Sequence, residues 1–177
     1  FHGALTHRPK AFQALAKPDR LGTMTTIPFF KMCGSGNDFI IVDNRRQTLP
    51  EDAFPDLARR LCARRISLGA DGFVVVERSQ VADFKWHFFN SDGSRAGMCG
   101  NAARCVARFA LLNGIAGHEM SFETDAGRIA AGVSGDRVKI RMTDPRGMAS
   151  GMRIETSLGP ITLSCIDTGA PHLVVEV

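Results

Sequence analysis

The sequence predicts an α/β protein in which short strands alternate with two helices. Short segments rich in Val, Ile and Phe, such as 73–76, are typical of strands. Two longer segments, 51–65 and 100–112, repeat apolar residues every three or four positions, as amphipathic helices do. The 177 residues, 44% of them apolar, are enough for one domain with a core, or for one domain and part of another.

The first elements can be placed from residue 27 onward. Strands are expected at 28–31 and 39–43, on either side of a glycine-containing loop at 33–38. The helix at 51–65 has one apolar face, and its last arginines suit the negative C-terminal end of a helix. The apolar face consists of Phe54, Leu57, Ala58, Leu61 and Cys62.

The next elements surround the second helix. A strand is expected at 84–89, followed by a polar turn at 90–93. The helix at 100–112 begins near Gly100, and Gly114 marks its end. Three further strands are expected at 120–124, 128–133 and 137–142, the last two joined by a hairpin turn at 134–136.

The two ends of the chain differ from its middle. Residues 1–26 are interpreted as a leader or disordered extension with a weak helical stretch at 11–16. A boundary loop at 145–147 is followed by one clear strand, 161–166, and a terminal strand, 173–177. So short a segment cannot build its own core. The expected domains are therefore 27–147 and the beginning of a second domain, 148–177.

Composition excludes several classes of protein. Most of the net charge of +4 comes from residues 1–23, and the rest lacks a basic face interleaved with aromatic residues, which argues against nucleic-acid binding. No apolar run approaches the roughly 18 residues of a membrane span. Five cysteines with irregular spacing fit free thiols in the cytoplasm. Because no His–Cys zinc spacing, P-loop, complete dinucleotide fingerprint or lysine context for pyridoxal phosphate is present, we expect neither a metal nor a cofactor.

The densest cluster of candidate functional residues is 89–105, where Cys99 directly precedes a helix. A helix N-terminus presents unpaired backbone N–H groups and about half a positive charge, and both stabilise a thiolate. The N–H groups of Gly100 and Asn101 can hold a carboxylate, and Gly100 lets a ligand come close. Cys99 is therefore a candidate to remove a proton next to a carboxylate. The alternative is that it is a small buried apolar residue.

The other cysteines do not suggest a second site. Cys105 lies six residues after Cys99, about 240° around the helix, so a disulfide or shared metal site between them is not expected. Cys105 and Cys62 are interpreted as core residues, and Cys33 and Cys165 as structural or incidental.

Five motifs lie along the chain from residue 27 onward. They are KMCGSGNDF at 31–39, GADG at 69–72, NSDGS at 90–94, MCGNAAR at 98–104 and GAPH at 169–172. Together they resemble the signature of the diaminopimelate epimerase family, and the resemblance covers residues 27–177. It implies a cofactor-independent enzyme that interconverts LL- and meso-2,6-diaminopimelate in lysine and peptidoglycan precursor synthesis.

The resemblance also implies a fold and a site. Family members have two similar halves, each a mixed sheet wrapped around a central helix, with the site in the cleft between them. By this resemblance Cys99 is one of two catalytic cysteines that act as a thiolate and thiol pair. The substrate-binding positions are Asn37, Asn90, Gly100 and Asn101. Members commonly dimerise, which makes a homodimer a candidate assembly.

The sequence departs from the family's pattern in three ways. Ala170 stands where many members have Asn, and Gly72 stands where some have a longer polar residue. The second half, with the second cysteine and a Glu-Arg pair, is not in the 177 residues, so the second domain is expected to be incomplete. Inversion needs a base and an acid on opposite faces of the carbon. We therefore expect a truncated half with little or no activity on its own.

Three other functions are alternatives to the epimerase. One is another cofactor-independent isomerase of the same fold, acting on proline-like or aconitate-like acids, which Ala170 keeps open. A second is a catalytically inactive binding module. The third, a thiol redox protein, is disfavoured because the sequence has no Cys-x-x-Cys motif.

Overall fold

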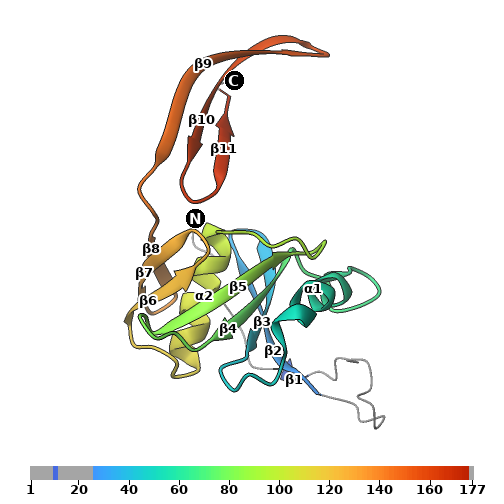
Figure 1. The fold of residues 1–177 in the computed structure, drawn as a ribbon, viewed down its shortest axis with the longest axis vertical. Helices are drawn as coiled ribbons and strands as arrows, with labels where there is room; N and C mark the ends of the chain where they lie inside the picture. Colours follow the sequence, from blue (N-terminus) through green and yellow to red (C-terminus); the bar gives the residue numbers. More distant parts are fainter. Residues whose placement is uncertain (1–9, 12–25, 176–177) are drawn as a thin grey trace.

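The computed structural model of the chain describes residues 10–11 and 26–175, which form a body and an arm that stands on it (Figure 1). The body is an eight-stranded sheet with two α-helices, and the arm is a separate three-stranded sheet. The main sheet contains β1 (Lys10–Ala11), β2 (Pro28–Gly34), β3 (Asn37–Asp43), β4 (Gly72–Glu77), β5 (Phe84–Asn90), β6 (Glu119–Thr124), β7 (Gly127–Ser134) and β8 (Arg137–Arg141).

The strands of the main sheet lie side by side in chain order. Two neighbouring pairs, β3–β4 and β5–β6, are parallel, and the others are antiparallel. Parallel neighbours need a crossover connection. The helices α1 (Phe54–Cys62) and α2 (Gly100–Leu112) lie in these two crossovers, so α2 begins at the edge of the sheet where β5 ends.

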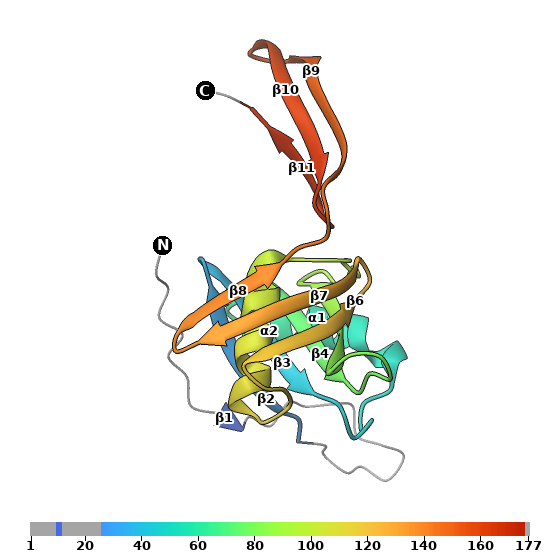
Figure 2. The ribbon, with the colours of Figure 1, turned by 90° about the vertical axis from the view of Figure 1, so that its left-hand side faces the viewer.

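Helix α2 is the centre of the body. It contacts β2 and β3 near one end of the sheet and β7 and β8 at the other, so the sheet curls around it (Figure 2). Its buried side is rich in alanine, which lets strands approach closely, and Phe109 fills the space beside Phe30 of β2. The predicted mixed sheet wrapped around a central helix is confirmed.

Helix α1 covers the opposite face of the sheet. The five residues of its predicted apolar face are all buried, and they contact β4 and β5. The α-helix is shorter than the predicted 51–65, because residues Glu51–Ala53 form a 3-10 turn and the helix ends at Cys62. Pro55 explains the start, since proline is tolerated in the first turn of a helix but not in its interior. None of the described helices is long and apolar enough to cross a membrane.

The central strands are buried on both faces. In β4, Val74 and Val76 pack toward α2, whereas Phe73 and Val75 pack toward α1. This explains why 73–76 is a continuous apolar run instead of an alternating one.

The arm consists of β9 (Arg146–Thr156), β10 (Gly159–Asp167) and β11 (Pro171–Val174). The predicted loop at 145–147 is confirmed at Pro145 but wrong at 146–147, because Arg146 opens β9, a strand that the sequence did not indicate. Glycines at 147 and 151 and a nearly continuous run of exposed residues give β9 no alternating pattern, and its pairing with β10 holds it extended. The assignment of 148–177 to a second domain stays a prediction.

Two predictions at the ends of the chain meet the limits of the described residues. Ala11, predicted to begin a helical stretch, is instead the last residue of β1 and pairs with Pro28 of β2. Residues 12–16 lie outside the described residues. The predicted terminal strand at 173–177 is observed as β11, which ends at Val174, and residues 176–177 lie outside the described part.

Candidate active site

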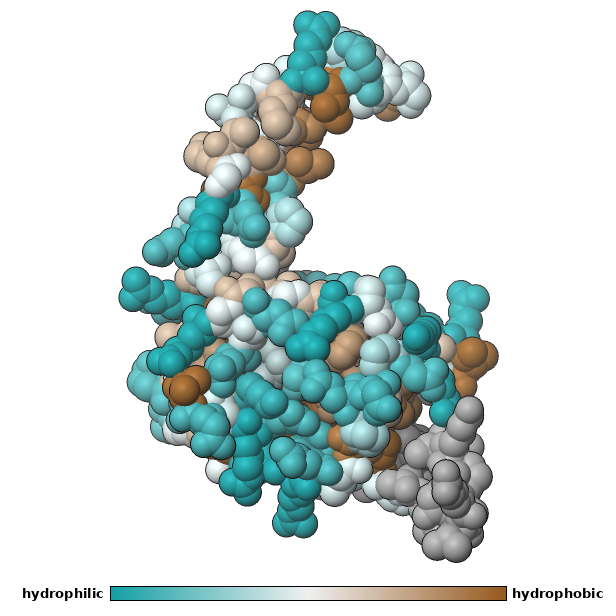
Figure 3. All heavy atoms as spheres, viewed as in Figure 1, coloured by the Kyte–Doolittle hydropathy of each residue, from teal (hydrophilic) through white to brown (hydrophobic). Residues whose placement is uncertain are grey.

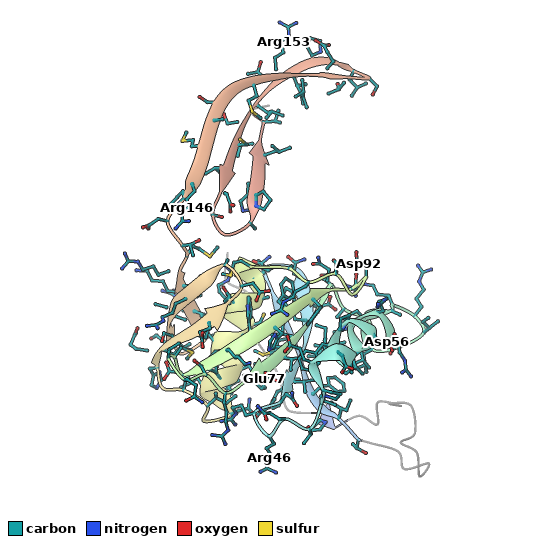
Figure 4. The ribbon with its side chains drawn as sticks, viewed as in Figure 1. Arg46, Asp56, Glu77, Asp92, Arg146 and Arg153 are labelled. Carbon is teal, nitrogen blue, oxygen red and sulfur yellow. The ribbon has the colours of Figure 1, made fainter. Side chains whose placement is uncertain are left out.

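The predicted site residues meet at one edge of the main sheet. Asn37 is the first residue of β3, and Asn90, the last residue of β5, pairs with Gly72 at the start of β4. Helix α2 begins at Gly100 on the same side. In Figure 4 the labelled Asp92, two residues after the end of β5, lies at the edge nearest the arm. This edge brings together residues that are up to 64 positions apart, such as Asn37 and Asn101.

Cys99 occupies the N-cap position of α2 with an extended backbone, and its side chain is half-buried against the α2 core. The backbone carbonyl of Cys99 accepts the first helical hydrogen bond, from the N–H of Ala103 at 2.9 Å. Its side chain makes no capping hydrogen bond. Side-chain caps normally occupy N–H groups of the first turn, and here the side chain of the N-cap residue occupies none of them.

Asn37 and Asn101 are joined directly. The Nδ2 of Asn101 donates to the Oδ1 of Asn37 at 2.6 Å, and the Nδ2 of Asn37 donates to Asp71 at 3.2 Å. Asn37 can reach α2 because alternate residues of β3, including Phe39 and Ile41, face that helix. Two of the predicted binding side chains therefore form one unit.

Asn90 is placed differently. Its exposed amide donates to the Oγ of Ser94 at 2.9 Å, within its own turn. Its neighbour Ser91 donates a backbone N–H to the carbonyl of Asp71 at 3.2 Å, which ties this turn to the start of β4. Asn90 thus lies on the same edge as Asn37, but its side chain is bonded separately.

A charged cluster supports this edge from the opposite face of β3. Asp38 pairs with Lys31 at 2.9 Å and with Arg64 at 2.6 Å, and Arg64 also pairs with Asp71 at 2.8 Å. Burial raises the pKa of Asp38, but hydrogen bonds and positive charge from Arg64 and Lys31 outweigh it and lower the pKa to about 2. Asp71 is the link between this cluster and Asn37.

The sequence reasoning missed Asp71 and Arg104 as parts of this edge. Arg104, one turn after Asn101 on α2, donates to the Oδ1 of Asn101 and, at 2.8 Å, to the Oγ of Ser35 in the β2–β3 turn. Both residues lie inside motifs that carry the family resemblance, Asp71 in GADG and Arg104 in MCGNAAR. The spacing of three residues between Asn101 and Arg104 was a usable signal, because residues three apart on a helix are neighbours.

Two glycines of the site have different surroundings. A Cβ at Gly100 would make only ordinary contacts, at 3.8–3.9 Å, with Arg104, Ile140 and Met142. A Cβ at Gly72 would lie 2.6 Å from Phe88 and 3.0 Å from the carbonyl of Phe89. Aromatic packing therefore leaves no room at position 72 for the longer polar residue that some members of the resembled family carry.

The arm reaches back to this edge. A Cβ at Gly169, in the turn between β10 and β11, would lie 3.5 Å from the Cβ of Met98 and 3.4 Å from that of Ala126. The turn that carries Ala170 is therefore next to the residue that precedes Cys99. Figure 1 shows the lower end of the arm close to the body.

The other cysteines are not placed beside Cys99 as reactive groups. Burial raises the pKa of Cys62 and that of Cys105 to about 12, and both are core residues as predicted. Cys33 is exposed, and it faces away from α2 together with its cross-strand partner Asp38. Among the described residues, no group of three or more His, Cys, Asp or Glu side chains could hold a metal ion.

Known structures define the class of fold. The chain is similar to a probable proline racemase from Agrobacterium radiobacter K84, solved with bound carbonate (TM-score 0.69, 19% identity, 86% of this chain and 52% of that one). It is also similar to a PhzF-family phenazine biosynthesis protein from Bacillus anthracis (TM-score 0.67, 20% identity, 87% and 56%). The chain therefore has the fold shared by these proteins.

Sequence comparison is more specific. The family model described as diaminopimelate epimerase matches residues 29–148, and the chain belongs to this family. A diaminopimelate epimerase from Aquifex aeolicus is 41% identical over 162 residues, and one from Hydrogenobaculum sp. is 40% identical over 156. These alignments cover 84% and 83% of the chain, and 57% and 56% of the relatives. The chain thus spans little more than half the length of these curated relatives.

Proposed function

We propose that this chain is part of a cofactor-independent epimerase that interconverts LL- and meso-2,6-diaminopimelate, with Cys99 as one of its two acid/base groups. The observation that carries the proposal is the half-buried thiol at the uncapped N-terminus of α2, beside the joined amides of Asn37 and Asn101. Membership of the family, whose named relatives are diaminopimelate epimerases, supports the choice of substrate.

The proposed reaction is a proton transfer at the α-carbon. The Cys99 thiolate takes the α-hydrogen as a proton, and the electron pair of the broken C–H bond moves into the neighbouring carboxylate as a carbanion forms. A thiol on the opposite face then donates its proton to the same carbon, which inverts the stereocentre. Each turnover leaves Cys99 as a thiol and the opposite group as a thiolate. The two groups therefore exchange roles in the reverse direction.

The surroundings of Cys99 support the stabilisation of negative charge. Free N–H groups in the first turn of α2, at Gly100 and Asn101, are suited to hold the substrate's α-carboxylate. The positive end of the helix favours both the thiolate and the charge that develops on the carboxylate. Asn37 and Asn101 provide further N–H donors, and Asn90 extends the binding edge along β5.

A second acid/base group is needed, and we propose that it lies outside the described residues. The four other cysteines are buried in the core, face away from α2 or, for Cys165, lie in the arm against the carbonyl of Gly147. On this proposal the 177-residue chain has little or no activity alone.

The proposal extends to the location and assembly of the protein. All five cysteines are free, which fits the cytoplasm. A homodimer is the candidate assembly of the protein.

The test is epimerisation of LL-diaminopimelate in D2O, followed by NMR as loss of the α-proton signal and appearance of the meso isomer. In an epimerase-active form of the protein, Cys99→Ala is expected to abolish both changes, so that the α-proton signal persists and no meso isomer appears. Cys33→Ala is the matched control, because it removes an exposed thiol on the other face of the sheet. Normal turnover by Cys99→Ala overturns the role of Cys99.

Two further results decide the rest of the proposal. Conversion of LL- to meso-diaminopimelate by the 177-residue chain alone contradicts the need for a second group. L-proline is the comparison substrate, and α-proton exchange of proline without exchange of diaminopimelate favours another isomerase of the same fold. Exchange of neither substrate by any form of the protein favours a binding module.

A further inference from the structure

Three hydrogen bonds form a chain across the candidate site, from α2 to the start of β4. Arg104 donates to the Oδ1 of Asn101, the Nδ2 of Asn101 donates to the Oδ1 of Asn37, and the Nδ2 of Asn37 donates to the Oδ2 of Asp71. The second and third bonds measure 2.6 and 3.2 Å. Each amide thus accepts one hydrogen bond and donates one within the chain.

The two ends of the chain fix its direction. A guanidinium group only donates hydrogen bonds, and a carboxylate only accepts them. If the amide of Asn101 were flipped, its NH2 group would face the guanidinium of Arg104. If the amide of Asn37 were flipped, its carbonyl would face the carboxylate of Asp71. Both arrangements oppose like partners, so only one orientation of each amide satisfies the chain.

We infer that Arg104 and Asp71 are positioning residues that hold the amides of Asn37 and Asn101 in the one orientation suited to a carboxylate ligand. In that orientation each amide has used one of its two N–H groups in the chain. The other N–H of each amide remains for an acceptor such as a carboxylate oxygen. A flip would exchange this donor for an oxygen lone pair, which repels a carboxylate. This inference rests on the proposed function for the identity of the ligand, but not for the orientation of the amides.

Both ends of the chain are themselves held by other contacts. Arg104 also donates to Ser35, which sits in the β2–β3 turn with a left-handed φ of 54°. Asp71 accepts the backbone N–H of Asp38 at 3.1 Å on the oxygen that Asn37 uses, and Arg64 on the other oxygen. Neither Arg104 nor Asp71 can rotate away without losing these bonds. The protein therefore holds the orientation of both amides without substrate.

The test is NMR of the side-chain NH2 groups of Asn37 and Asn101 in the ligand-free 177-residue chain. Arg104→Met keeps the length of the side chain but removes its donors. It is expected to shift the NH2 resonances of both asparagines and to speed their exchange with water. Arg108→Met is the matched control, because Arg108 lies one turn further along α2 and pairs with Asp136 of the β7–β8 turn. Arg104→Lys, which restores a cationic donor, is expected to reverse the shift at Asn101.

A second variant tests the other end of the chain. In Asp71→Asn the new NH2 group must face a donor, Asn37 or Arg64, whichever way it turns, so the resonances of Asn37 are expected to shift. Asp83→Asn is its control, because Asp83 accepts a backbone N–H from Ser121, away from this edge. Resonances of Asn37 and Asn101 that move no more in Arg104→Met and Asp71→Asn than in the controls overturn the inference.

Kinetics separate this inference from the proposed function. In an epimerase-active form, Arg104→Met is expected to raise KM for LL-diaminopimelate about tenfold, the effect of losing one hydrogen bond, with a smaller change in kcat. An NMR shift without a change in KM supports the positioning role of Arg104 and overturns the assignment of the amides as substrate ligands. A raised KM without any NMR shift overturns the positioning role.

Discussion

Ion pairs fix the charged residues that support the candidate site, and Asp38 shows this most clearly. Its pKa is lowered to about 2 although burial alone raises it, because Arg64 and Lys31 bind its carboxylate. A carboxyl group with a lowered pKa stabilises the folded state at every pH above its unfolded value of about 3.9. This contribution is lost as the pH falls from about 4 through 2.

Removal of Arg64 is expected to raise the pKa of Asp38 toward its usual value. Carboxyl NMR titration of Arg64→Ala measures this pKa. The free energy of unfolding of the variant is then expected to fall less between about pH 4 and pH 2 than that of the unchanged protein. Asp43 is the internal control, because its own lowered pKa depends on Arg45 and is expected to stay unchanged. An Asp38 pKa that remains near 2 in the variant contradicts the account of the cluster.

The residues of the site were predictable from the sequence to different degrees. The position of Cys99 and Gly100 at a helix N-terminus followed from local pattern, because the start of α2 depends on nearby residues. The bond between Asn37 and Asn101 joins positions 64 apart, so only the family resemblance suggested that they share a site. The role of Asp71 depends on strand register across β3, β4 and β5, which local pattern does not contain.

At the scale of elements, predictions succeeded where one face of an element alone determines its structure. Helix α2 begins and ends at the predicted residues, because its apolar stripe packs against a surrounding sheet and Gly114 has the left-handed φ typical of a helix end. Strand β9 has no such stripe, since all but one of its residues are exposed. Its extended form depends on β10, a partner that the sequence pattern of β9 does not reveal.

The attachment of α1 to the main sheet is expected to depend on its few buried side chains. Leu57 is 8% exposed and belongs to the core cluster between α1 and β4. Leu57→Ala is expected to lower the free energy of unfolding by about 2–5 kcal/mol, because it removes buried methyl groups and leaves a cavity. Urea unfolding followed by circular dichroism measures this loss.

The control for α1 is Asp56→Ala on the exposed side of the same helix. Asp56 makes only a surface ion pair with Arg60, at 3.8 Å, so the expected loss is a few tenths of a kcal/mol. Equal losses in the two variants contradict the described packing of α1 on the sheet.

The whole molecule divides into a body with two buried clusters and an arm with almost none. Both clusters lie in the body, one on each face of the main sheet. In the arm Leu163 is the one described residue that is buried, and hydrophobic side chains are exposed along it (Figure 3). The exposed large apolar residues of the arm are Met148, Met152, Ile154, Leu158, Leu173, Val174 and Val175. The hydrophobic stabilisation of the fold therefore resides in the body.

This division predicts that the arm of the 177-residue chain opens without unfolding the body. Hydrogen exchange of a segment reports the free energy of its own opening, and exchange becomes about tenfold faster for each 1.4 kcal/mol by which that energy falls. Hydrogen–deuterium exchange with mass spectrometry is expected to find much faster exchange in β9, β10 and β11 than in β3 and β4, which remain protected. Within the arm, the β10–β11 turn is expected to exchange most slowly, because Gly169 lies against Met98 and Ala126. Equal protection of β9 and β4 contradicts this prediction, since it requires the arm and the body to open as one cooperative unit.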